Sequence, residues 1–480
     1  MTDTFVLSRR SLFRLSFFLF FLVISAALLF RSFTEGFGPA GAASFENIQI
    51  AQNYASLWYR DPLIQGSRMV LVLPYHLLLG SLLSFFGMKI TLLFLPLLLV
   101  GGLLFFTILL FSRLEVSQRS TVLALLGFLL SPALIYAGTR FSPQLFVLFL
   151  IAFTLWLAMS ANPLLRGFAY PVMLLIAWSG IIPLLLFLLM LRYALRFAGR
   201  SENQYRGFAF FLLLVSLFLL TLTVPDWAVL TLVPSLPAFF AKTITIFGGH
   251  PGISGFLLLL SSIGFFVSWY RRKRYVLLYG FLLFLFLVQA FSLFDVSIYL
   301  TLLLLPLAVM GFESLLNRRW QLLLVKRLTI VILFYGLLFS SVAYSKIAAQ
   351  DKPTEDLLAA LGWIRDNTPP EKTVFTSQEN GFLVSAIAGR PVMIDDDYYR
   401  VTEGKKIQED YRLILSSRNL KQTMSLLKDY DVGYILITSG MKEGETFSRE
   451  DEGLLFVLTN PDHFRRVYSR NKDDLWEVIP

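Results

Sequence analysis

The sequence predicts a polytopic α-helical membrane protein whose C-terminal part is an extracytoplasmic α/β domain. Hydrophobic residues make up 56% of the 480 positions and charged residues 15%, with a mean hydropathy of +0.67. Soluble domains are nearer to half apolar and about a quarter charged. Residues 1–345 hold 24 Lys/Arg and 9 Asp/Glu, whereas residues 346–480 hold 18 and 23. Apolar runs long enough to cross a bilayer recur only in the first of these two parts.

The composition also excludes several classes of protein. The chain has no Cys, which excludes a disulfide scaffold, a thiolate metal site and a Cys nucleophile. The net charge of +10 would suit nucleic acid, but the excess basic residues lie in short loops between apolar runs. Membrane topology accounts for that placement, so we expect no nucleic-acid partner.

About eleven transmembrane helices are predicted in residues 1–345. Most of them come from separate apolar runs, namely 15–31, 88–111, 120–137, 143–159, 207–225, 253–269, 275–292, 297–313 and 327–345. Residues 168–191 form one long run interrupted by Ser179, Gly180 and Pro183, which predicts two short helices joined by a tight turn. The first run also has the basic start of a signal peptide, but its length and the many runs that follow favour an uncleaved helix.

Basic residues set the predicted orientation, because cytoplasmic loops are rich in Lys and Arg. A cytoplasmic N-terminus puts 18 of the 24 basic residues of the membrane part in cytoplasmic loops. The odd number of helices then places residues 346–480 on the extracytoplasmic side of an integral, multi-pass protein of the cell membrane.

Residues 69–86 leave one ambiguity in this topology, because they are apolar as well. If they span the membrane, the loops at 112–119 and 138–142 exchange sides. Pro74, Tyr75, His76 and Gly80 interrupt the run. We therefore expect a helix that lies on the outer membrane surface.

The first outer loop, residues 32–87, contains the strongest catalytic candidate. Glu46 opens a helical pattern in which Ile50, Tyr54 and Leu57/Trp58 follow at steps of three or four. One interpretation of Glu46 is a charge at a helix N-terminus, which the helix dipole favours. The other is a general base or metal ligand that faces a lipid-borne substrate.

Two further outer segments are of interest. At the end of the short loop 138–142, Ser142 is expected to be the N-cap of the next helix, with Pro143 as its first helical residue. Arg140 is either an interfacial anchor or a cation that holds a phosphate. The segment 226–252 reads as an outer loop that closes over a substrate, with His250 as a turn residue.

The tail, residues 346–480, alternates predicted helices and strands, which is typical of a small α/β domain. The helices are Thr354–Asn367, with Thr354 as its cap, then Asn380–Ala388 and Leu420–Tyr430. The strands are Thr373–Thr376, Arg390–Ile394, Gly433–Thr438, Arg465–Ser469 and Leu475–Ile479. The run Asp395-Asp396-Asp397 is either a solvated loop or a divalent-ion site.

In this order, the motifs resemble the GT-C superfamily of membrane glycosyltransferases, especially the archaeal type related to the oligosaccharyltransferase catalytic subunit and the protein mannosyltransferases. The first loop is similar in plan: an acid, then Asp61-Pro62, Gly66-Ser67-Arg68 and Pro74-Tyr75-His76. The stretch Leu361–Pro369 resembles the helix that opens the outer domain of the family. Nearly the whole chain takes part in the resemblance.

The resemblance implies transfer of a sugar from a polyprenyl-phosphate-linked donor to a protein, lipid or glycan acceptor at the outer membrane face. Glu46 takes the catalytic place, as a base or as a ligand of Mg²⁺ or Mn²⁺. The positions that match substrate-binding regions are Asp61, Arg68, His76, Arg140, Gln144, Glu379 and Asn380.

The chain also departs from the family pattern. Asn47 follows Glu46 where many relatives have a second acid, and Gln144 stands where an acid is frequent. Ser377–Gly381 replaces the Trp-Trp-Asp-Tyr-Gly of oligosaccharyltransferases, so we do not expect glycosylation of sequons. The alternative function is a non-catalytic relative that binds lipid-linked glycan or a partner protein. A transporter is disfavoured, because the apolar runs contain hardly any charge and no internal repeat.

Overall fold

The computed structural model describes residues 41–52, 58–61, 64, 68–199, 203–223, 243–246, 248–250, 252–270, 272–290, 295–350, 352–398, 401, 403–449 and 451–479. They form two compact units. The first unit holds the described residues from 85 to 220 and from 243 to 350. The second combines residues 41–84 and 221–223 with residues 352–479. The predicted span at 15–31 and most of the loop at 226–252 lie outside the described residues.

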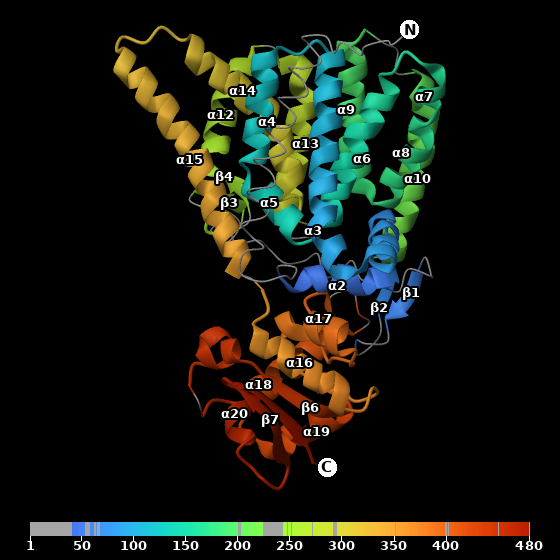
Figure 1. Ribbon diagram of the computed structural model, residues 1–480, viewed down its shortest axis with the longest axis vertical. Coiled ribbons are helices and arrows are strands. Elements are labelled where there is room, and N and C mark those ends of the chain that lie inside the picture. The colour runs from blue at the N-terminus through green and yellow to red at the C-terminus, as the bar shows by residue number, and fades with distance from the viewer. Residues whose placement is uncertain are drawn as a thin grey trace, which may run out of the picture. The chain divides into compact units, whose positions relative to one another are not determined.

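The first unit is a bundle of apolar helices (Figure 1). Its elements are α3 (Pro74–Arg113, which starts in the second unit), α4 (Gln118–Leu129), α5 (Pro132–Thr139), α6 (Pro143–Ala158), α7 (Pro163–Gly167), α8 (Ala169–Trp178), α9 (Ile181–Phe197), α10 (Asn203–Thr223), β3 (Ile244–Thr245), β4 (Ile253–Ser254), α12 (Gly255–Trp269), α13 (Arg272–Ala290), α14 (Ser297–Asn317) and α15 (Leu323–Gln350). The strands β3 and β4 pair in parallel.

Four helices among the described residues are long and apolar enough to cross a membrane, or five if one bent pair counts as one span. The bent pair is α4 with α5, which meet at 57°. The sequence predicts a span at 120–137, and the structure divides these residues between two helices that meet at Ser131. Ser131 is extended and Pro132 has no N–H to continue the α4 hydrogen-bond ladder, so a new helix begins there.

Two other breaks agree with the sequence. Gly180, at a φ of 129°, separates α8 from α9, as the run 168–191 predicts. Gly87, at a φ of 74°, divides α3 into Pro74–Met88 and Ile90–Arg113. The first of these pieces belongs to the shorter apolar helices, which are not counted among the spans, and the surface position of residues 69–86 stays a prediction.

The closest helix packing in the first unit joins α12 and α14. A Cβ on Gly264 would collide with the carbonyl oxygen of Leu307, and one on Gly311 would collide with that of Leu260. Ser261 Oγ also donates a 3.0 Å hydrogen bond to Leu304 O across the pair. Such contacts between small residues let the helix backbones touch, as is common between membrane helices.

The second unit contains α2 (Ala42–Gln52), the hairpin β1 (Trp58–Asp61) and β2 (Arg68–Leu71), the start of α3, and the tail. The tail elements are α16 (Glu355–Asn367), β5 (Thr373–Phe375), η2 (Gln378–Asn380), α17 (Gly381–Leu383), η3 (Val384–Ala388), α18 (Gly404–Ser416), α19 (Leu420–Asp429), β6 (Val432–Ile437), η5 (Met441–Glu445), α20 (Leu454–Val457), β7 (Phe464–Arg470) and β8 (Asp473–Val478). Figure 1 shows α16, α18 and α19 beside the sheet of this unit.

The tail sheet has the strand order β5-β6-β8-β7, with β5 parallel to β6 and the other pairs antiparallel. Its apolar side chains and those of the helices form one core, which also takes in Phe45 and Ile64 from the first outer loop. The predicted helix cap is confirmed, because the Thr354 side chain accepts a hydrogen bond from Leu357 N at 3.1 Å.

Two tail elements differ from the sequence expectation. Residues 390–394 do not form a strand, and only Val392 makes isolated bridges, to Val374 and to Ile64. Pro391 lacks the N–H that a ladder needs. Helix α18 is not predicted, although Ile407, Tyr411 and Ile414 are buried at helical spacing.

Arg390 ties the ends of two tail segments together. Its guanidinium is buried and donates five hydrogen bonds, which reach the oxygen atoms Thr368 Oγ1, Thr368 O, Arg365 O, Ala388 O and Gly389 O at 2.6–3.3 Å. These carbonyls lie at the C-terminal ends of α16 and η3. The negative end of a helix dipole favours a cation at such a position.

Candidate functional site

Glu46 lies within helix α2 rather than at its start. The helix begins at Ala42, after Gly41 at a φ of 70°, and its first turn holds no acidic residue. The interpretation of Glu46 as a dipole-favoured N-terminal charge is therefore wrong. The expected stripe also ends early, because Trp58 belongs to strand β1.

Helix α2 is buried on two sides. On one side, Phe45 packs into the tail core. On the other, Ile50 forms a small apolar cluster with Val70 and Val72, which belong to β2 and the residues just after it. Because a helix turns by about 100° per residue, Glu46 projects between these two sides, and it is half-buried. Glu46 thus lies between the two buried sides of a helix that packs against the protein on both.

The hairpin after α2 brings two candidate residues into register. Strand β1 pairs with β2 in antiparallel fashion, and Asp61 lies opposite Arg68 at its closed end. The sequence names both residues as substrate-binding candidates, and the pairing places their backbones side by side.

His76 is buried in the first turn of α3, with 3% of its surface exposed. Its Nδ1 accepts a hydrogen bond from Leu73 N at 3.1 Å, and its Nε2 lies 2.9 Å from Asn47 Oδ1. Burial lowers the pKa of His76 to about 3, so the ring is neutral at physiological pH. Both ring nitrogens have hydrogen-bond partners within the protein, so His76 is not arranged to bind a substrate.

The tail reaches α2 from the opposite side. Ser385 Oγ donates a 3.1 Å hydrogen bond to Gln49 Oε1, and both residues are buried. Ser385 belongs to η3, and both η3 and α17 pack against α2. The candidates Glu379 and Asn380 lie in η2, immediately before α17. Asn380 Nδ2 donates to Ser377 Oγ at 2.7 Å, which fixes that turn.

Two of the three consecutive Asp residues accept hydrogen bonds from other residues of the tail. Asp395 is fully buried, and its Oδ1 accepts a hydrogen bond from Asp397 N at 2.9 Å. Asp396 Oδ1 accepts from Gln378 Nε2 at 3.1 Å. Within the residues that the structure describes, no three His, Asp or Glu side chains are grouped so that they could hold a metal ion.

The other candidate cation, Arg140, belongs to the first unit. It ends helix α5, and its guanidinium carbon lies 4.8 Å from the centre of the Tyr136 ring. Phe141 follows at a φ of 51°. Ser142 then caps α6 by accepting a 3.3 Å hydrogen bond from Gln144 N, which confirms the predicted cap and the place of Pro143.

Gln144 connects the same loop to helix α14. Its side-chain amide donates to the carbonyl oxygen of Asp295. The Asp295 side chain in turn accepts hydrogen bonds from Ser297 N and Ser297 Oγ at 3.1 and 2.6 Å. The loop that carries Arg140 is thereby fixed to the start of α14.

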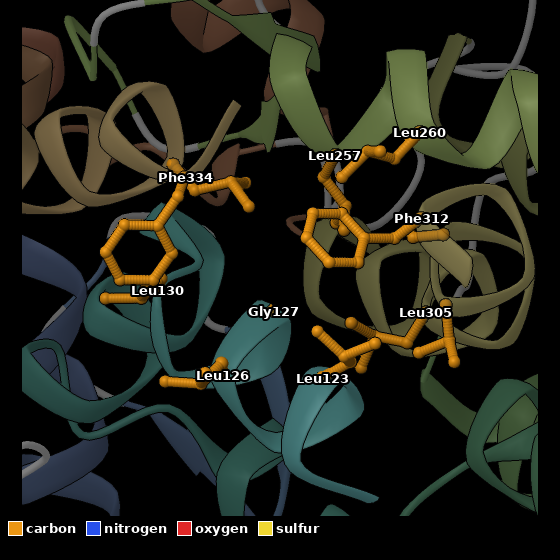
Figure 2. Close-up of a pocket in the computed structure, with 12 residues that line it drawn as sticks. Leu123, Leu126, Gly127, Leu130, Leu257, Leu260, Leu305, Phe312 and Phe334 are labelled. Atoms are coloured by element: carbon orange, nitrogen blue, oxygen red, sulfur yellow. The ribbon is translucent and has the colours of Figure 1, made fainter. Parts of the chain in front are cut away.

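The described part of the first unit also contains a pocket of about 50 Å³ between α4, α12, α14 and α15. Figure 2 shows Phe312 and Phe334 on the two sides of this space, with Gly127 between them in the view. Every residue that lines it is apolar, so the pocket offers no group for acid–base chemistry or for binding a phosphate.

Sequence reasoning missed the residues that hold α2, namely Asn47, Gln49 and Ser385. Asn47 stands out in the sequence only as a missing acid. Its contact with His76 spans 29 residues, and the contact of Gln49 with Ser385 spans 336 residues. No local pattern reports contacts over such distances. The proximity of Asn47 to Glu46 on a short polar segment is the only signal that the sequence contains.

No protein-family model and no curated protein matches the chain in sequence. Solved structures match it in fold. The oligosaccharyltransferase AglB from Archaeoglobus fulgidus, in complex with an inhibitory peptide and a dolichol-phosphate, is similar with a TM-score of 0.58 and 12% identity. The match covers 93% of this chain and 72% of that one.

Two further structures show the same likeness. ArnT from Cupriavidus metallidurans, bound to undecaprenyl phosphate, has a TM-score of 0.50 and 11% identity, with 96% of this chain and 98% of that chain covered. The arabinofuranosyltransferase AftD from Mycobacteria has a TM-score of 0.53 and 12% identity over 96% of this chain, which spans only 40% of AftD. The apolar helices of the first unit fit a polytopic membrane protein. This chain has the fold that the solved AglB, ArnT and AftD share.

Proposed function

We propose that the protein transfers a sugar from a polyprenyl-phosphate-linked donor to an acceptor at the outer membrane face. The observation that carries this proposal is the likeness in fold, over more than nine-tenths of the chain, to two proteins solved with polyprenyl phosphates. The placement of Glu46 supports it further, because a half-buried carboxylate on a firmly held helix suits a general base.

In the proposed reaction, Glu46 accepts the proton of the acceptor nucleophile as that nucleophile attacks the anomeric carbon. The bond from this carbon to the phosphate oxygen breaks, and its electron pair leaves with the lipid phosphate. Arg140 stabilises the negative charge that develops on the phosphate. A single displacement of this kind inverts the configuration of the sugar.

The remaining candidates receive supporting roles. Gln144 fixes the loop of Arg140 to the start of α14 through the Asp295 carbonyl. Asp61 and Arg68, paired at the end of the hairpin, are proposed to bind the polar part of the donor. Glu379 and Asn380, which lead into α17, are proposed to contact the acceptor.

Glu46 is also the one proposed metal ligand. A relative in fold, AglB from Archaeoglobus fulgidus, was solved with Zn and sulfate. In this chain the described residues do not supply three suitable ligands in one place. The residues thus do not fit a protein-held metal site, and we derive no step through a metal.

Transfer of radiolabelled sugar from synthetic polyprenyl-phosphate donors by the purified protein in lipid tests the function. Glu46→Gln keeps the shape of the side chain but removes the base, so we expect transfer to fall by about 10²–10⁴-fold. Glu371→Gln, at an exposed tail carboxylate, is the matched control and should leave the rate unchanged. Undiminished transfer by Glu46→Gln would contradict the role of Glu46. Donor binding without turnover by the unaltered protein would favour the non-catalytic alternative.

We also propose a cytoplasmic N-terminus and an extracytoplasmic domain over residues 346–480. The sequence contains no Cys, so a single introduced Cys is the only position in this chain that a membrane-impermeant maleimide labels. Ser448→Cys should be labelled in intact cells, whereas Gln321→Cys and Gln118→Cys should be labelled only after permeabilisation. Labelling of Gln118→Cys in intact cells would mean that residues 69–86 cross the membrane.

A further inference from the structure

Two polar side chains of helix α2 make hydrogen bonds from nearly opposite faces of the helix. Asn47 and Gln49 are two positions apart, which corresponds to a rotation of about 200° around the helix. Asn47 contacts His76 at the start of α3, and Gln49 contacts Ser385 of the tail. Glu46 adjoins Asn47 in the sequence, so the rotation of α2 about its axis sets the direction in which the Cα–Cβ bond of Glu46 points.

The hydrogen-bond pattern of His76 defines its tautomer. Nδ1 accepts the N–H of Leu73, so it carries no proton in the neutral ring. The ring proton is therefore on Nε2, and Nε2–H donates to Asn47 Oδ1 at 2.9 Å. One nitrogen of the ring thus accepts a hydrogen bond from the backbone at Leu73, and the other donates a hydrogen bond to α2.

We propose that His76 is a positioning residue, which holds Asn47 and thereby sets the direction in which Glu46 points. His76 is closed off from substrate by its burial, and both of its ring nitrogens are used. The hydrogen bond of Ser385 to Gln49 completes the arrangement from the tail side. This inference rests on the proposed function, because it assigns Glu46 the role of base.

Two substitutions of His76 separate positioning from bulk packing. His76→Leu fills the space but removes both hydrogen bonds. His76→Gln places an amide N–H near the position of Nε2 and keeps the donor to Asn47. We expect His76→Leu to lower kcat by about 10- to 100-fold, since small misplacement of a catalytic group has effects of that size. The KM for the lipid donor should stay the same, and His76→Gln should recover most of kcat.

Amide hydrogen exchange of residues 44–52 gives a readout that does not depend on activity. In His76→Leu these amides should exchange at least about tenfold faster, while those of β6 stay protected. In His76→Gln they should exchange almost as slowly as in the unaltered protein. The double variant His76→Leu/Asn47→Ala should exchange no faster than His76→Leu alone, because both changes remove the same contact.

The outcomes distinguish this inference from the proposed function. If the unaltered protein transfers no sugar, or if Glu46→Gln stays active, the proposed function or the role of Glu46 fails, and the exchange data alone decide whether His76 holds α2. If Glu46→Gln is inactive but His76→Leu keeps both its kcat and its slow exchange, the inference about His76 is overturned. Equal loss of kcat in His76→Gln and His76→Leu would also overturn it.

Discussion

The helices of the first unit and those of the second unit are held in place by different kinds of contact. In the first, α12 and α14 meet through Gly264 and Gly311, and their backbones touch. In the second, α2 and α16 are held by an apolar core together with side-chain hydrogen bonds, such as those of Gln49 and Arg390. Lipid provides no hydrophobic force that pushes one helix against another, so close packing must do so. In water the hydrophobic effect does drive helices together. Polar side chains can then determine the orientation of each helix.

The largest expected effect is that of Gly264→Leu. The new Cβ would collide with the backbone at Leu307, and backbone cannot swing aside as a side chain can. The cost should exceed the 1–3 kcal/mol that is usual for overpacking, and little folded protein should be recovered in detergent chromatography. Gly280→Leu is the control, because a Cβ there has nothing within 4 Å. Normal recovery of Gly264→Leu would refute the dependence of the first unit on close helix contact.

Arg390→Met should have the next largest effect, and in the second unit. The change removes the five hydrogen bonds that the guanidinium donates to oxygen atoms. Removal of the guanidinium leaves buried acceptors without a partner, and each such loss costs about 1–3 kcal/mol. Thermal unfolding of the full chain in detergent checks this, with Arg449→Met at an exposed position as control. If the two variants unfold at the same temperature, polar side chains do not hold the second unit.

Phe45→Ala tests whether the first outer loop shares its stability with the tail. Phe45 belongs to the first loop in sequence but packs in the tail core, and a buried Phe→Ala change costs about 3 kcal/mol. Amide exchange in β6 should become faster, although that strand is far away in the sequence. Leu413→Ala, which is 42% exposed in α18, should change β6 much less. Unaltered exchange in Phe45→Ala would mean that loop and tail are independently stable.

The smallest expected effect is that of Thr354→Ala. The Thr354 side chain caps α16 through Leu357 N, and loss of such a cap costs about 1 kcal/mol. Thr354→Ser keeps the hydroxyl and should behave as the unaltered chain in thermal unfolding. Equal stability of all three proteins would show that the core alone determines the start of α16.

Local chemistry allowed a large part of the fold to be predicted. The caps at Ser142 and Thr354 and the break at Gly180 depend on residues next to them, and all three are confirmed. The bend at Ser131 was missed because Pro within a helix does not always break it, as Pro96 and Pro306 show. Helix α18 starts after Glu403, which has a positive φ and makes no side-chain cap, so the usual start signal is absent.

The candidate site was less accessible to sequence reasoning. Composition singles out Glu46, because acids are rare in residues 1–345. It does not report that α2 packs with the tail, or that His76 bonds to Asn47. Those contacts depend on which surfaces fit together after folding, and a segment of eleven residues contains too little information to specify its partners.

The shared core of α2 and the tail has a consequence for the order of synthesis. Helix α2 leaves the ribosome early, whereas Ser385, which donates a hydrogen bond to Gln49 of this helix, is made more than 300 residues later. Until then, the face of α2 that contains Phe45 and Gln49 lacks the tail residues that it contacts in the folded chain. A nascent or prematurely ended chain therefore holds the acidic side chain without its final support. Helix α2 therefore gains its full set of packing contacts only after the tail has been made.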